Sequence, residues 1–178
     1  MKKKYYMYIF ILLLVIFLVY FIFIRNNEDI YENVYTDDLV KEEIGAMINS
    51  DKISSKITSI MHGSNNINLL DYDISIVDGD ILIKDNGNNE IKKSIDNDSF
   101  YKMVGYNKLN DGYVYVLSNK GYVYYFNLLD KEIVRLNYSN IDEILIVDIF
   151  RTYLDTGKEE SDKLVYLVSA GKFVELKQ

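Results

Sequence analysis

Residues 112–126 read GYVYVLSNKGYVYYF and decide the fold of most of this chain. Two runs of alternating residues each follow a glycine, and the segment Ser118-Asn119-Lys120 separates them. Alternation with a period of two is typical of a half-buried strand, and valine and tyrosine both favour strands. Because the separating segment is short and polar, the stretch predicts a β-hairpin.

The length of the turn decides which side chains of this hairpin share a face. A two-residue turn at Asn119-Lys120 places one set on the same face: Tyr113, Tyr115, Leu117, Tyr122, Tyr124 and Phe126. A three-residue loop with a bulge at Gly121 exchanges the sets on one strand. The aromatic residues then form either a half-buried core face or an exposed surface for a glycan or a partner protein. The candidate binding residues are Tyr113, Tyr115, Tyr122, Tyr124 and Phe126.

Short runs of Ile, Val, Leu and Tyr continue on both sides of the hairpin. Short connections favour antiparallel neighbours, so we expect one antiparallel meander that forms a sandwich or a curved sheet. The expected ten strands are 73–77, 80–84, 90–94, 100–106, 113–117, 122–127, 132–137, 143–151, 164–169 and 172–177. Turns with positive φ are expected at Asp78-Gly79, Asn86-Gly87, Asp111-Gly112, Gly121 and Gly171.

The segment 100–136 can be drawn as four strands of a propeller blade. A closed propeller needs at least four such blades, and this chain has room for two or three. We therefore assign the similarity between the two halves of the hairpin to hairpin chemistry alone.

The segment 36–62 carries a helical pattern. Thr36, Asp37 and Asp38 are typical of a helix start, because acidic side chains favour the positive end of the helix dipole. Apolar residues then recur at helical spacing in two sets, which point to opposite sides of one helix. We therefore expect two short helices within 36–62, with a break near residues 49–50. The fold class is then α+β and mainly antiparallel β, with the β-rich part at 70–178.

An uncharged apolar run extends from Tyr5 to Ile24 and follows Lys2, Lys3 and Lys4. At about 1.5 Å per helical residue it spans roughly 30 Å, the thickness of a hydrocarbon core. The run is longer than that of a secretory signal, and no cleavage site of small residues follows it. We therefore expect a transmembrane signal anchor that contacts the lipid bilayer and ends at Arg25.

The charges on either side of the run give its orientation. The three lysines precede it, whereas acidic residues dominate the segment that follows it. Since positive flanks remain cytoplasmic, we expect a single-pass protein of the cell membrane with its N-terminus inside. The expected parts are a cytoplasmic tip at 1–4, the anchor at 5–25, a juxtamembrane linker at 26–35 and an extracytoplasmic domain at 36–178.

Composition narrows the classes of partner. Residues 26–178 contain all 27 acidic residues and 16 of the 20 basic ones, a net charge of −11. This charge argues against binding nucleic acid. The chain has no Cys and one His, His62, so no zinc site with the usual ligands can form within it. His62 falls near the expected end of the second helix, where a capping or surface role is favoured over catalysis.

Two other patterns could mark either a functional site or an ordinary hairpin turn. Asp155-Thr156-Gly157 matches the D-T-G of aspartic proteases, but Lys158 follows it and too few residues remain for the strands that those enzymes need. Asp78, Asp80 and Asp85 offer oxygen atoms to Ca²⁺, although the register of a calcium loop is not satisfied. We interpret both as turns, and we expect no cofactor, no metal and no catalytic residue.

These observations predict a membrane-anchored extracytoplasmic domain that binds or scaffolds components of a bacterial cell envelope. The expected partners are the bilayer, through residues 5–24, and an envelope protein or glycan. Two alternatives stay open. One is a surface hydrolase that acts on cell-wall polymer through carboxylate pairs. The other is an accessory subunit of a secretion or conjugation machine, which depends only on the order of helices and strands.

Overall fold

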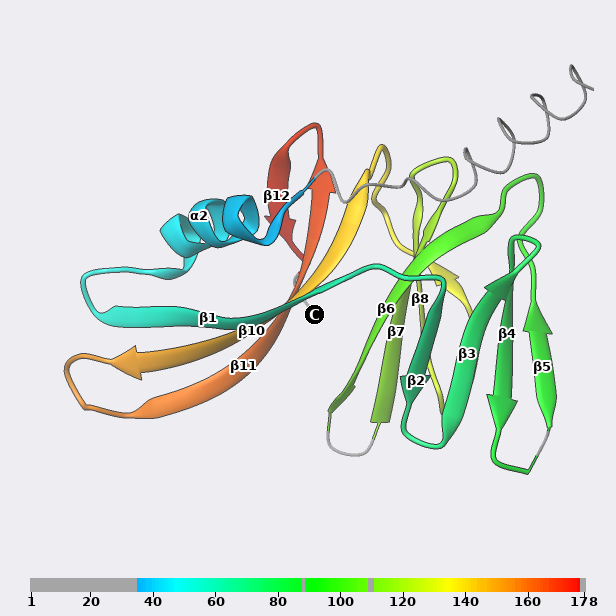
Figure 1. Cartoon of the computed structure of the whole chain (residues 1–178), viewed down its shortest axis with the longest axis horizontal. Coiled ribbons are helices and arrows are strands. Elements are labelled where there is room, and N and C mark those ends of the chain that lie inside the picture. Colours follow the sequence, from blue (N-terminus) through cyan, green and yellow to red (C-terminus); the bar gives the residue numbers. More distant parts are fainter. Residues whose placement is uncertain (1–34, 88, 109–110, 177–178) are drawn as a thin grey trace, which may run out of the picture. The chain divides into compact units, whose positions relative to one another are not determined.

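The computed structural model describes residues 35–87, 89–108 and 111–176 (Figure 1). The residues named above for the membrane anchor, Lys2, Lys3, Lys4, Tyr5, Ile24 and Arg25, lie outside these ranges. So do the expected cytoplasmic tip and almost all of the expected linker. Within the described ranges, no helix has the length and apolar character needed to cross a membrane.

The described part of the chain contains one helix and twelve strands. The helix is α2 (Asp37–Ile48). The strands are β1 (Ile53–His62), β2 (Asn66–Leu69), β3 (Tyr72–Val77), β4 (Asp80–Asp85), β5 (Glu90–Lys93), β6 (Phe100–Lys108), β7 (Asp111–Ser118), β8 (Val123–Asn127), β9 (Val134–Arg135), β10 (Glu143–Tyr153), β11 (Glu159–Ser169) and β12 (Lys172–Glu175).

These strands form three antiparallel sheets of four strands each, so the prediction of one continuous meander was wrong. We call β2-β3-β4-β5 the first sheet, β6-β7-β8-β9 the central sheet and β1-β10-β11-β12 the third sheet. The first two are local meanders, and the central sheet consists of the four strands drawn above as a propeller blade. The predicted β-rich, mainly antiparallel class is confirmed.

The predicted second helix is also wrong, because its residues form β1, which pairs with β10. A β-bulge between Ile57 and Ser59 explains the error. One extra residue reverses the alternation, so Ile53, Ile57 and Ile60 all fall on the same face of a strand. Their spacing of four and three residues is also that of one helical face, and periodicity alone could not separate the two.

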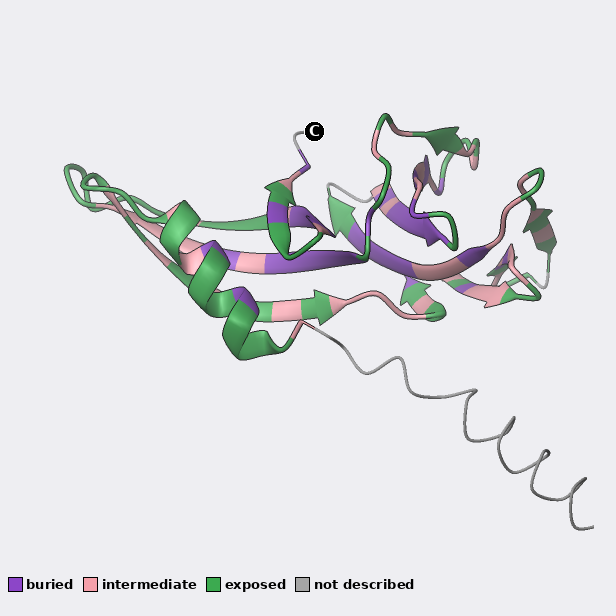
Figure 2. Cartoon of the chain, turned by 90° about the horizontal axis from the view of Figure 1, so that it is seen from above, coloured by how far each residue is buried: buried purple, intermediate pink, exposed green. Residues whose placement is uncertain are grey.

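The central sheet lies between the other two sheets and buries both of its faces (Figure 2). One face packs Val104, Tyr115 and Leu117 against Ile144, Ile146 and other residues of the third sheet. The opposite face packs against the first sheet, through Met103, Val114, Val116 and Phe126 on the central side and Ile74, Ile81 and Ile83 on the other. This double burial explains the unbroken runs without charged residues in the middle of these strands, Met103–Tyr106 in β6 and Tyr113–Leu117 in β7.

Helix α2 lies over the other face of the third sheet (Figures 1 and 2). Val40 and Ile44 are one turn apart on the helix and are both fully buried. Alternation along β10 directs Leu145 and Val147 to this face, and both are fully buried as well. The helix therefore shields a side of the sheet that the central sheet does not cover.

Several other elements also differ from the sequence prediction. Asp111 and Gly112 lie in β7, where a Cβ on Gly112 would overlap the side chain of Leu128. This glycine therefore leaves room for packing and does not form the predicted turn. Strand β11 begins five residues earlier than expected, at Glu159, and strand β2 was not predicted at all. The predicted turns at Asp78-Gly79, Gly121 and Gly171 do have positive φ.

Tyr166 on β11 is fully buried, and its hydroxyl has no hydrogen-bond partner among the described residues. Burial raises the pKa of Tyr166 to about 12. In an unfolded chain the pKa of tyrosine is about 10. The neutral phenol therefore contributes stability that is complete below pH 10, and this contribution is lost as the pH rises toward 12.

We expect Tyr166→Phe to raise the free energy of unfolding by about 1 kcal/mol at pH 8, because it removes a buried hydroxyl that has lost its hydration. The variant should also lose less stability than the wild-type chain between pH 10 and pH 12. Urea unfolding of both proteins at pH 8 and pH 11 measures the two effects. A stability loss at pH 8 would show that the hydroxyl has a stabilising partner.

Candidate binding site

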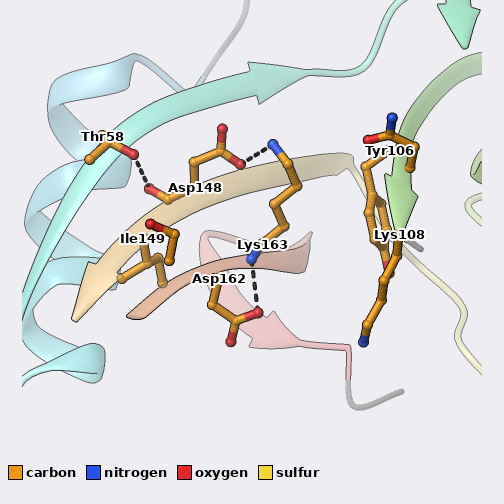
Figure 3. A pocket seen from close by; sticks show the side chains of 9 residues that line it. Thr58, Tyr106, Lys108, Asp148, Ile149, Asp162 and Lys163 are labelled. Carbon is orange, nitrogen blue, oxygen red and sulfur yellow. Dashed lines mark hydrogen bonds and ion pairs between the residues drawn. The ribbon is translucent and has the colours of Figure 1, made fainter. Parts of the chain in front are cut away.

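A cleft of about 410 Å³ lies between the end of β6 and the long hairpin of β10 and β11 (Figure 3). Tyr106, Asn107 and Lys108 line it from the central sheet. The third sheet supplies the remaining lining residues: Thr58, Asp148, Ile149, Ser161, Asp162 and Lys163. The cleft is thus a junction between two sheets, and most of its lining side chains are polar.

Hydrogen bonds and an ion pair fix Asp148 on the floor of the cleft. Its Oδ1 lies 2.6 Å from Lys163 Nζ, and its Oδ2 accepts a hydrogen bond of 2.7 Å from Ser59 Oγ. Thr58 Oγ1 donates to the backbone oxygen of Asp148 at 3.1 Å. Both carboxylate oxygens are therefore already engaged, and three strands hold the carboxylate in place.

The charges of the cleft are unequally compensated. Asp162 Oδ2 lies 3.0 Å from Arg151, and Asp162 Oδ1 accepts a hydrogen bond from the backbone of Lys163 at 2.9 Å. Lys108 is exposed on the opposite wall and has no ion-pair partner among the described residues. The ammonium group of Lys108 is therefore the part of the cleft best placed to bind an anionic group.

A row of four tyrosines stands behind this wall. Tyr106 stacks on Tyr113 with ring centroids 5.6 Å apart, and Tyr113 stacks on Tyr125 at 6.2 Å. Tyr115 completes the group, 5.3 Å from Tyr125. Burial raises the pKa of Tyr113, and the neighbouring Asp111 carboxylate raises it further. The stacked rings make a rigid wall that fixes the position of Tyr106.

The five aromatic residues predicted to bind a ligand do not share one face of the hairpin. Tyr115 pairs with Tyr125, and Val114 with Phe126, which is the register of the exchanged alternative. Tyr113 and Tyr115 therefore face the third sheet, whereas Tyr124 and Phe126 face the first sheet. Tyr115 and Phe126 are buried, and Tyr122 lies in the turn under the Arg135 guanidinium, 3.6 Å from its ring centre.

The structure does not bring the three calcium candidates together. Asp78 forms the β3–β4 turn, and Asp80 and Asp85 lie at opposite ends of β4. Asp80 pairs with Lys92 at 2.7 Å, which is the main reason that its pKa is lowered. Asp85 accepts hydrogen bonds from the backbone of Gly87 and from both the backbone and the side chain of Asn89. In the described part of the chain, no three His, Cys, Asp or Glu side chains are arranged to hold a metal.

His62 and the D-T-G segment make contacts within the fold and lie away from the cleft. His62 ends a strand and not a helix, and its Nε2 lies 2.8 Å from the carboxylate of Asp37, the first residue of α2. Asp155-Thr156-Gly157 forms the turn between β10 and β11, where Gly157 has a φ of +66° and its N–H donates to the oxygen of Tyr153. Neither segment lines the cleft.

None of the site predictions from the sequence included the cleft residues Tyr106, Lys108, Asp148 and Lys163. One signal was present, because Asp148 interrupts the apolar run Ile144-Leu145-Ile146-Val147 and Ile149-Phe150. A charged residue inside a strand that is otherwise apolar needs a partner, and Lys163 supplies it across the hairpin. The approach of β6 could not be read from the sequence, because it depends on the packing of two sheets.

The chain matches no protein-family model, no curated protein and no solved structure.

Proposed function

We propose that this chain is a membrane-tethered binding module of a bacterial cell envelope, and that its ligand occupies the cleft between β6 and the β10–β11 hairpin. The observation that carries the proposal is the exposed ammonium group of Lys108. It lies across the cleft from Asp148 and Lys163, whose charges are already paired with each other. Fixed charges of this kind orient a polar ligand without a large reorganisation of the site.

The charge pattern favours a ligand that carries a carboxylate. Such a group can approach Lys108 while its neighbouring polar atoms contact Asn107 and Ser161 on the two walls. Peptide segments of envelope proteins and the stem peptides of the cell wall both offer this chemistry. The apolar run at 5–24 would hold the module at the membrane surface, where these ligands are concentrated.

A photo-crosslinking amino acid at Asn107 in the full chain tests the proposal in living cells. We expect an adduct in the envelope fraction, and we expect Lys108→Glu to reduce its yield about tenfold, equivalent to about 1.4 kcal/mol of binding energy. Lys84→Glu in the first sheet is the matched control and should leave the yield unchanged. Mass spectrometry of the adduct distinguishes a protein from a wall fragment. Equal yields in both variants would exclude this cleft as the binding site.

A second candidate function, hydrolysis of cell-wall polymer, draws on the Asp148 carboxylate in the same cleft. The side chain of Asp162, the other acidic residue of the lining, lies on the opposite face of β11. Asp148 is engaged by Lys163 and Ser59, and Asp162 by Arg151, so the two carboxylates do not form the facing pair that such a hydrolase needs. The two functions are separated by Asp148→Asn in the full chain. A hydrolase would lose its activity on purified peptidoglycan, whereas the binding module has no activity to lose.

A further inference from the structure

The outer edge of β11 is only partly covered. Strand β12 pairs with β11 from Tyr166 to Ser169, and Leu176 N–H donates to the oxygen of Val165 at 2.8 Å. Strand β11 continues for six more residues in the other direction, to Glu159. Within the described ranges, no strand pairs with this part of its edge (Figure 1). We call residues 159–163 the free edge.

The direction of the main-chain groups along the free edge follows from the sheet. The oxygen of Val165 points toward β12, and successive residues of a strand direct their N–H and C=O groups to alternate sides. The pairing of β10 with β11 has no register shift. Lys163, Ser161 and Glu159 therefore direct their N–H and C=O groups outward. The outward N–H of Lys163 is bonded to the side chain of Asp162, at 2.9 Å.

We propose that two copies of this chain pair through their free edges as antiparallel strands, about a two-fold axis at Ser161. On such an axis a residue faces its own copy. An axis at any of the charged residues would place two like charges opposite each other; these are Glu159, Glu160, Asp162 and Lys163. Ser161 is the uncharged residue of the free edge, so an axis at Ser161 avoids this repulsion. This register also places the outward groups of Glu159, Ser161 and Lys163 opposite those of the partner copy. The N–H of Lys163 would exchange its bond to Asp162 for one to the partner.

The same register produces complementary charges on the face that carries the cleft. Glu159 of each copy lies opposite Lys163 of the other, so by symmetry each Lys163 ammonium group, which already pairs with Asp148, gains a second carboxylate. Glu160 and Asp162 meet on the opposite face, where Lys158 pairs with Glu160 and Arg151 pairs with Asp162 at 3.0 Å. Their like charges are therefore compensated within each copy before the copies meet.

This pairing has a structural consequence for the cleft. Ser161 and Lys163 line the cleft, so the second copy places its own Glu159 at the rim of each site. The hairpins of the two copies join into one sheet that runs β1-β10-β11 and then the same strands of the partner in reverse. The dimer requires no ligand, and it can be tested apart from the proposed function.

A single cysteine at Ser161 provides the test, because the chain contains no other. Residues that form a hydrogen-bonded antiparallel pair have Cα atoms about 5.5 Å apart, within the range of a disulfide. In the full chain in membranes, we expect Ser161→Cys to form a disulfide-linked dimer under mild oxidation. Glu160→Cys and Asp162→Cys are the matched controls, since their copies would lie about 8 Å apart across this axis, too far for a disulfide.

The expected result is crosslinking at least tenfold faster at position 161 than at positions 160 and 162. A second variant, Ser161→Pro, removes an N–H that makes no hydrogen bond to any described residue. This variant should fold, since proline is tolerated on an edge strand. In a mixture of Glu159→Cys and Lys163→Cys chains, the proposed register brings the two cysteines opposite each other. Adding Ser161→Pro to both chains should abolish this crosslink. Equal rates at the three positions, or a maximum at 160 or 162, would overturn the proposal and leave the charged edge as a device that prevents pairing.

Discussion

Glu143→Ala is expected to lower the free energy of unfolding by about 3–5 kcal/mol, because it breaks a buried ion pair. Glu143 on β10 is 2% exposed, and its carboxylate contacts the ammonium group of Lys102 on β6. The second carboxylate oxygen accepts a hydrogen bond of 3.1 Å from Ile144 N–H. Removing the carboxylate leaves the charge of Lys102 in a site with little access to water. Denaturant unfolding of the purified full chain measures the loss.

The matched control for this experiment is an exposed ion pair. Lys84 and Glu90 lie 3.2 Å apart in the first sheet, and each side chain is about half exposed. Glu90→Ala should therefore cost less than about 1 kcal/mol. If the two substitutions have similar effects, the contact between Lys102 and Glu143 does not hold the central and third sheets together.

Phe126→Ala is expected to have an effect of the same size, a loss of about 3–5 kcal/mol. Phe126 is fully buried between the central and first sheets, so its truncation leaves a cavity beside Val114 and Val116. Tyr122→Ala removes another aromatic ring of the same hairpin, but this ring is half-buried and contacts the Arg135 guanidinium. We expect Tyr122→Ala to cost about 1 kcal/mol.

Thermal unfolding of both variants by circular dichroism compares these two positions directly. A large difference shows that the aromatic residues of the hairpin are divided between core and surface, as the observed register requires. A destabilisation by Tyr122→Ala as large as that by Phe126→Ala would contradict this division. The comparison also decides which aromatic positions can be changed freely in binding experiments.

Much of the β-rich fold could be predicted from the sequence, because local alternation reports which residues are half-buried. The hairpin at 112–126 and the strands that follow Tyr72 were found in this way. The grouping into three sheets was not found, because it depends on pairings between distant segments, such as that of β1 with β10. The bulge at Ile57 and Ser59 gave β1 the spacing of a helix, and only its pairing with β10 shows the difference.

The candidate site was harder to predict than the fold. The aromatic residues were conspicuous in the sequence, but two of them, Tyr115 and Phe126, are core residues. The cleft is instead built from Lys108 and Asp148, which are 40 positions apart in the chain. Asp148 stands out within its apolar strand, but its position in a cleft depends on Lys163 across the hairpin and on the approach of β6. No periodicity within one strand carries that information.

The pairing of β1 with β10 has a consequence for how the chain acquires its structure. His62 lies opposite Leu145, so more than eighty residues must be made before β1 meets its neighbour. The two local meanders can form while the chain emerges, since their contacts are close in sequence and cost little loop-closure entropy. Strand β1 stays unpaired through this period, so it is the segment most exposed to aggregation during synthesis.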